Sequence, residues 1–64
     1  MNREEFMLYL QDNFDIYGES FRLIANILQF ASTISNEADR YHFLCDMLEG
    51  TIGLSDREIR QIDL

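Results

Sequence analysis

His42 and Cys45, the only histidine and the only cysteine of this chain, stand three residues apart. On a helix that spacing makes them neighbours, and a thiol beside an imidazole is a minimal arrangement for nucleophilic catalysis. The helical pattern, however, turns Cys45 toward the expected core and His42 away from it. A buried cysteine behaves as a small apolar group, and its thiol is usually inert. The sequence therefore predicts no catalytic site and a protein that is not an enzyme.

A metal site is the second chemistry that these residue types allow. Asp39, His42 and Asp46 share one face of the same expected helix, and carboxylates with imidazole can bind a divalent cation. One helix cannot complete the ligand shell, so a site would need a second chain. We therefore expect a solvated acidic face, with no metal and no cofactor.

The charge of the chain is strongly one-sided. Twelve acidic residues oppose five basic ones, all arginine, and the formal net charge is −7. This excess argues against nucleic acid and anionic membranes as direct ligands and favours a basic protein surface, such as that of a nucleic-acid-binding protein. The single cysteine excludes an intramolecular disulfide, and no apolar run is long enough to span a bilayer. We expect a cytoplasmic protein without a signal peptide.

The apolar period is helical throughout the 64 residues, of which 47% are hydrophobic and none is proline. The pattern predicts one all-α domain over residues 1–64, a compact small bundle of four helices with a short C-terminal helix. The expected helices span about residues 3–13, 19 or 20 to 34, 37–49, and a short stretch after Ser55. The second is apolar around most of its circumference, so we expect it to be central, with the first and third packed across it.

Two helix starts carry capping-box sequences, in which an acceptor side chain precedes a glutamate by three residues. The two pairs are Asn2 with Glu5 and Ser55 with Glu58. Leu54 and Ile59 flank the second start at the positions of a hydrophobic staple. The third helix is expected to begin after Asn36 and to end at Gly50.

The third helix has three faces by its spacing. A core face holds Tyr41, Leu44, Cys45 and Leu48. An acidic face holds Asp39, His42, Asp46 and Glu49. Phe43 and Met47 form a third stripe almost opposite the core.

More apolar groups are present than one core face per helix requires: Leu8, Phe14, Ile16, Tyr17, Phe43 and Met47. Aromatic residues and methionine are enriched in interface cores. The alternative is that the last helix and the first loop fold over them. For Phe43 and Met47 both interpretations stay open, whereas Tyr17, next to the turn glycine Gly18, is expected to be exposed.

The segment from Gly53 to Ile59, GLSDREI, resembles the start of the scaffold helix in LuxR-type helix-turn-helix domains. The resemblance covers about ten residues and implies a further helix that enters the major groove. The chain stops at Leu64, and acidic residues surround Arg57 and Arg60. Repulsion from DNA therefore opposes direct binding.

We expect a non-enzymatic protein-binding module, a small acidic inhibitor or accessory protein that occupies a basic, nucleic-acid-binding surface of its partner. It resembles phage and mobile-element inhibitors of the anti-CRISPR and anti-restriction type in size, charge and lack of catalytic equipment. The alternatives are a homo-oligomeric structural protein, such as a homodimer paired through Phe43 and Met47 or through Leu8, and a small helix-turn-helix-like regulator. The expected partner-binding residues are Asp12, Asp15, Tyr17, Glu19, Asp39, Phe43, Asp46, Met47 and Glu49.

Overall fold

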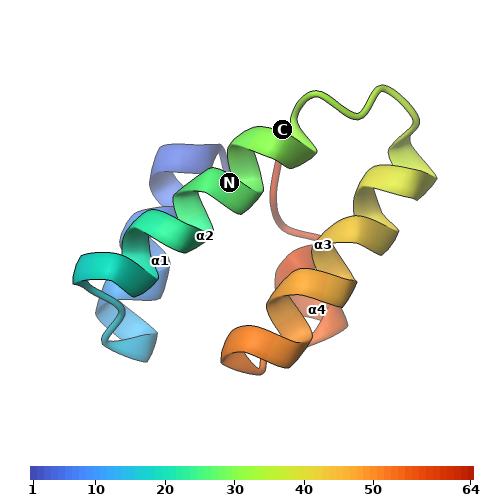
Figure 1. Cartoon of the computed structure of the whole chain (residues 1–64). Coiled ribbons are helices and arrows are strands. Elements are labelled where there is room, and N and C mark those ends of the chain that lie inside the picture. The colour runs from blue at the N-terminus through green and yellow to red at the C-terminus, as the bar shows by residue number, and fades with distance from the viewer.

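The computed structural model describes all residues 1–64. It contains four helices, α1 (Arg3–Phe14), α2 (Gly18–Ala31), α3 (Glu37–Ile52) and α4 (Asp56–Ile59). Helices make up 72% of the chain and there are no strands, which confirms the all-α class. Contacts join α1 to α2, α2 to α3 and α3 to α4, so α2 does lie between α1 and α3 (Figure 1). None of the helices has the length and apolar character needed to cross a bilayer.

The helix starts follow the capping sequences. The Asn2 side chain accepts a hydrogen bond from the Glu5 backbone N–H at 2.8 Å, and the Glu5 carboxylate accepts one from the Asn2 N–H at 3.0 Å. Ser55 and Glu58 make the same reciprocal pair at α4. Asn36 accepts from the Asp39 N–H at 3.0 Å, as expected for the N-cap of α3. These side chains satisfy donors that a helix start leaves unpaired.

Two predicted helix ends were wrong. Helix α3 continues through Gly50 to Ile52, because Gly53, with φ 70°, is the residue in the left-handed conformation that ends it. Ile52 thereby packs against the core. Helix α2 stops at Ala31 instead of Ile34. The hydroxyls of Ser32 and Thr33 donate to the carbonyls of Gln29 and Phe30, and such local bonds compete with continued helix.

Eleven buried side chains, all apolar, form the core: Phe6, Met7, Leu10, Ile16, Ile24, Leu28, Ala31, Leu44, Leu48, Leu54 and Ile59. They come from every helix and from the segments before α2 and α4. Leu54 and Ile59, the expected staple, are both buried. The short α4 is therefore held by its two apolar contacts with the core and not by its own length.

Helix α2 is central, but its apolar residues are not all buried. Only Ile24, Leu28 and Ala31 are buried, along one stripe of spacing four and three. Leu23 and Phe30 are more than half exposed. Helix α4 is too short to cover this side of α2, so an apolar strip of the helix faces solvent.

The two ends of the chain lie side by side. The Met1 ammonium donates to the Gln61 carbonyl at 2.6 Å and is 3.3 Å from the Asp63 carboxylate, and the Asp63 N–H donates to the Met1 carbonyl at 2.6 Å. After α4 the chain makes a turn and then runs without helix to Leu64. The segment that follows the helix-turn-helix-like start is thus a closing tail and not a second helix.

Candidate functional site

An exposed apolar surface spans α2 and α3. The rings of Phe30 on α2 and Phe43 on α3 lie 5.1 Å apart between centroids. Phe30 is 58% exposed and Phe43 is half-buried beneath it. Leu23, seven residues before Phe30, is 52% exposed, and Met47, four after Phe43, is 41% exposed. We call these four residues the α2–α3 surface. Of the two residues whose exposure the sequence left open, Met47 is therefore exposed, whereas Phe43 is partly buried against the core.

Exposed acidic residues lie near the residues of the α2–α3 surface on both helices. On α3, Asp39 precedes Phe43 by four residues and Asp46 precedes Met47 by one, and both carboxylates are exposed. On α2, Glu19 lies four residues before Leu23, on the same side of the helix. The structure therefore groups three predicted acids, Glu19, Asp39 and Asp46, with exposed apolar side chains.

The first loop forms a separate cluster at the far end of α2 from Phe30 (Figure 1). Asp15 ends α1 in the left-handed conformation, with φ 55°. Tyr17 follows it and is 60% exposed, as expected. Asp12 is exposed one turn earlier. Glu19, in the first turn of α2, links this loop to the α2–α3 surface.

Glu49 lies elsewhere than the other predicted partner-binding residues. Its carboxylate, the Cys45 thiol and the Asp56 carboxylate place their ligand atoms within 4.8 Å of one another. A hydrogen bond with Asp56 raises the pKa of Glu49 and lowers that of Asp56, so the two carboxyls compete for one proton. Three such groups could hold a divalent cation if water completed its shell. The sequence pointed to Asp39 and Asp46 for this chemistry, but the structure instead brings in Asp56 from the next helix.

The side chains of Cys45 and His42 contact different groups. The Cys45 thiol donates to Asp56 Oδ1 at 3.7 Å, whereas the His42 ring packs edge-on against Tyr41 with centroids 6.1 Å apart. Burial, and then the neighbouring carboxylates, raise the pKa of the Cys45 thiol. The thiol is therefore protonated at neutral pH, the opposite of what a nucleophile needs.

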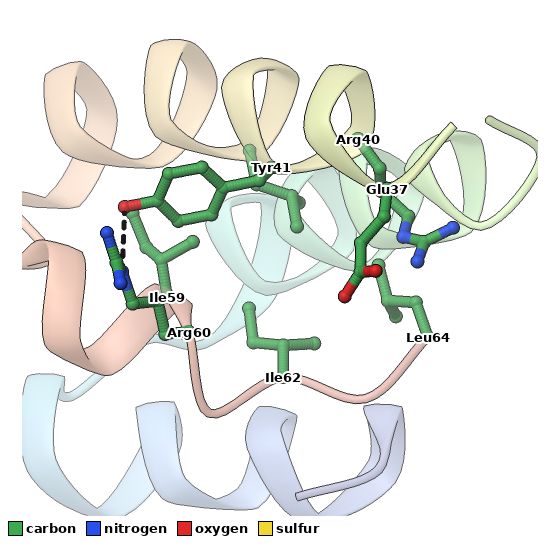
Figure 2. A pocket seen from close by; sticks show the side chains of 8 residues that line it. Glu37, Arg40, Tyr41, Ile59, Arg60, Ile62 and Leu64 are labelled. Atoms are coloured by element: carbon green, nitrogen blue, oxygen red, sulfur yellow. Dashed lines mark hydrogen bonds between the residues drawn. The ribbon is translucent and has the colours of Figure 1, made fainter. Parts of the chain in front are cut away.

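A cavity of about 350 Å³ lies between α3 and the tail that follows α4 (Figure 2). Its apolar wall includes Leu44, Ile59, Ile62 and Leu64. Arg60 stands at one end, where its Nε donates to the Tyr41 hydroxyl at 3.3 Å and its guanidinium lies 5.2 Å from the ring centroid.

Arg40 stands at the other end of this cavity and donates to the Ile34 carbonyl at 2.9 Å. Glu37 lies on the same side (Figure 2). Both guanidinium groups thus have partners within the chain, and a carboxylate is already present.

Sequence reasoning missed Leu23 and Phe30, the two most exposed members of the α2–α3 surface. Both were assigned to the buried part of a central helix. The signal was present, because Leu23, Ile27 and Phe30 recur at spacings of four and three on a stripe beside that of Ile24 and Leu28. A helix with two apolar stripes needs a packing neighbour for each stripe. In this chain the second stripe is only partly covered by other residues.

The chain matches no protein-family model, no curated protein and no solved structure in the comparisons made.

Proposed function

We propose that this chain is a non-enzymatic protein-binding module, an acidic inhibitor or accessory protein that occupies a basic, nucleic-acid-binding surface of a partner. The observation that carries the proposal is the aromatic pair formed by exposed Phe30 and half-buried Phe43, 5.1 Å apart, with exposed acidic residues nearby on both helices. Exposed apolar patches rimmed by polar residues are typical of interaction sites.

The two kinds of side chain have different roles in the proposed complex. Phe30, Phe43 and Met47 would supply most of the binding energy by leaving water, as aromatic and apolar anchors do at interface centres. Asp39, Asp46 and Glu19 would speed encounter with a positive surface and fix its orientation. The net charge of −7 extends that attraction beyond direct contact.

The first loop adds a second contact region. Tyr17 offers an exposed ring, and Asp12 and Asp15 flank it with carboxylates. Glu49 is the weakest member of the proposed set, because it faces Asp56 and Cys45. We therefore rank the α2–α3 surface first, the loop second and Glu49 last.

An inhibitory role follows from what a basic surface usually does. Such surfaces serve nucleic acid, so a protein that covers one blocks DNA or RNA binding. Anti-CRISPR and anti-restriction inhibitors of phages share this small acidic format, and the likeness is one of size and charge.

The test is affinity capture from a bacterial lysate with three immobilised chains: wild type, Phe30→Ser, and the double variant Asp39→Asn/Asp46→Asn. Gln61→Ser, in the segment after α4, is the control, because Gln61 is exposed and lies outside the α2–α3 surface and the first loop. We expect basic nucleic-acid-binding proteins to be captured by wild type and the control and lost with both test variants. The purified partner should release labelled nucleic acid when the chain is added.

The proposal predicts that capture of the partner depends on the salt concentration. Raising the salt from about 50 mM to about 500 mM shortens the Debye length roughly threefold and should weaken capture. Capture that is indifferent to salt and to the Asp39/Asp46 variant would overturn the electrostatic part. Binding that leaves the partner's nucleic acid in place would overturn the inhibitory part.

A further inference from the structure

A second apolar surface lies on the opposite side of α2. It is a groove of about 460 Å³ between α1 and α2. Its apolar lining consists of Met7 and Leu8 from α1 and Phe21 and Ala25 from α2. Leu8, pointing away from the core of its own helix, is 58% exposed. Ala25 is two residues from Leu23, a rotation of about 200° around the helix. The groove and the α2–α3 surface therefore face different directions.

The two rims of this groove carry opposite charges. On the α1 rim, Glu4 and Asp12 stand four residues before and after Leu8. Arg3, next to Glu4 at the start of α1, also lines the groove, and on the α2 side the basic residue is Arg22, three residues before Ala25. The chain contains one ion pair, between the Met1 ammonium and the Asp63 carboxylate, and neither Arg3 nor Arg22 takes part in it. Both guanidinium groups are thus unpaired in the monomer.

We propose that the α1–α2 groove is the interface of a homodimer. A two-fold axis presents the same patch from both copies, so that a groove with an acidic rim and a basic rim is complementary to itself. Arg22 on α2 of one copy would then face Glu4 and Asp12 on α1 of the other while the two Leu8 side chains become buried. The α2–α3 surface lacks this property, since its Glu19, Asp39 and Asp46 would meet like charges.

The area that a dimer needs is compatible with this face. A standard interface removes about 800 Å² from each partner, roughly a fifth of the 4331 Å² that the monomer exposes. Helices α1 and α2 have 12 and 14 residues and pack against each other. Their common outer side carries the groove. The dimer would leave its two α2–α3 surfaces pointing outward, so it could hold two partner molecules.

The test is sedimentation equilibrium of the full chain at concentrations from about 10 μM to about 1 mM, a range that covers weak to moderate dimers. We expect wild type to be dimeric at the upper end. Leu8→Ser should raise the dimer Kd at least about tenfold, as loss of an interface anchor does. Leu23→Ser, an equally exposed leucine on the other side of α2, should leave the Kd unchanged. Circular dichroism of both variants checks that the fold is retained.

Exchanging the charges of Glu4 and Arg22 provides a second test of the interface. Unfolding of a variant could not produce the expected recovery in the double variant. Glu4→Arg and Arg22→Glu should each weaken the dimer, and the double variant should restore it, because opposite charges again face each other between copies. Added salt should weaken the wild-type dimer.

Three outcomes would overturn the proposal. The first is a strict monomer at about 1 mM. The second is a dimer that Leu23→Ser dissociates and Leu8→Ser does not. The third is a monomer whose capture of a partner protein is lost with Leu8→Ser, which would assign the groove to that partner instead.

Discussion

The Tyr9 hydroxyl on α1 donates a hydrogen bond to the Glu58 Oε2 on α4, at 2.6 Å and across 49 positions of sequence. Glu58 also accepts from the Ser55 backbone N–H through its other oxygen, at 3.1 Å. One carboxylate therefore both caps the shortest helix and ties it to the first. Together with the contacts of Met1 with residues 61–63, it closes the chain on itself.

Replacing Tyr9 by phenylalanine should lower the melting temperature at neutral pH, since only the hydroxyl is removed while the ring contact with Phe6, at 6.2 Å, can remain. Tyr17→Phe is the matched control, because Tyr17 is exposed, and it should leave the melting temperature unchanged. The melting temperatures are measured by thermal denaturation, monitored by circular dichroism. Equal melting temperatures for the two variants would show that the bond to Glu58 does not stabilise the fold.

The same bond predicts a pH dependence. Hydrogen bonds from Tyr9 and then Ser55 lower the pKa of Glu58 below its ordinary value of 4.5. A carboxyl whose pKa is lowered by folding adds stability above its unfolded pKa, and this stability is lost as pH falls through the folded pKa. The difference between wild type and Tyr9→Phe should therefore be constant down to pH 4.5 and shrink below it. A difference that grows on acidification would contradict this origin.

Gly50 and Gly53 should respond to alanine with opposite signs. Gly53 has φ 70° and ends α3, so Gly53→Ala should destabilise by about 1–2 kcal/mol. Gly50 lies inside the helix with no atom near an added Cβ, so Gly50→Ala should stabilise by about 0.5–1 kcal/mol. Urea denaturation measures both. The reverse pair of signs would place the helix end at Gly50, as the sequence first suggested.

These glycines also show how far the sequence determines the fold. Capping pairs such as Asn2 with Glu5 are local, so their spacing alone identified the helix starts. The end of α3 is not local. Both Gly50 and Gly53 are suitable stop residues, and the choice depends on Ile52 packing against the core. The hydrophobic periodicity of the sequence does not reveal the contact of Ile52 with the core.

The candidate site was predictable to a similar extent. Tyr17 could be predicted as exposed because a turn glycine follows it, whereas the surplus stripe left the exposure of Met47 open. The partner of Phe43 could not be predicted, since its contact with Phe30 depends on how α2 and α3 cross. Likewise, the approach of Asp56 to Glu49 requires the turn at Gly53 that brings α4 beside α3.

Glu49→Gln should raise the melting temperature at pH 7. A proton shared with Asp56, followed by burial and the charge of Asp56, raises the pKa of Glu49 above its ordinary 4.5. A carboxyl whose pKa is raised by folding adds stability below its unfolded pKa and loses it as pH rises through the folded pKa. Ionised Glu49 is therefore unfavourable at neutral pH, whereas the glutamine amide can donate to Asp56.

The gain from Glu49→Gln should vanish below pH 4.5, where the carboxyl is already protonated. Asp12→Asn on α1 removes the same charge at a site away from Asp56 and serves as the control. Melting temperatures of both variants, measured from pH 7 to below pH 4.5, distinguish an effect of the Glu49–Asp56 pair from an effect of the overall negative charge. The same gain in the control would show that general relief of the −7 charge, and not the pair, is responsible.

Cys45 should react slowly with iodoacetamide at pH 8, although its thiol is partly accessible. Burial first, and then the charge of Asp56, raise its pKa above the ordinary 9.0. Since only the thiolate attacks, the folded chain should be alkylated more slowly than the same chain unfolded in urea. Asp56→Asn should increase the folded rate by removing one repelling charge and leave the unfolded rate unchanged. A folded rate equal to or above the unfolded one would mean that the thiol is activated, and the environment of Cys45 would then be that of a reactive group.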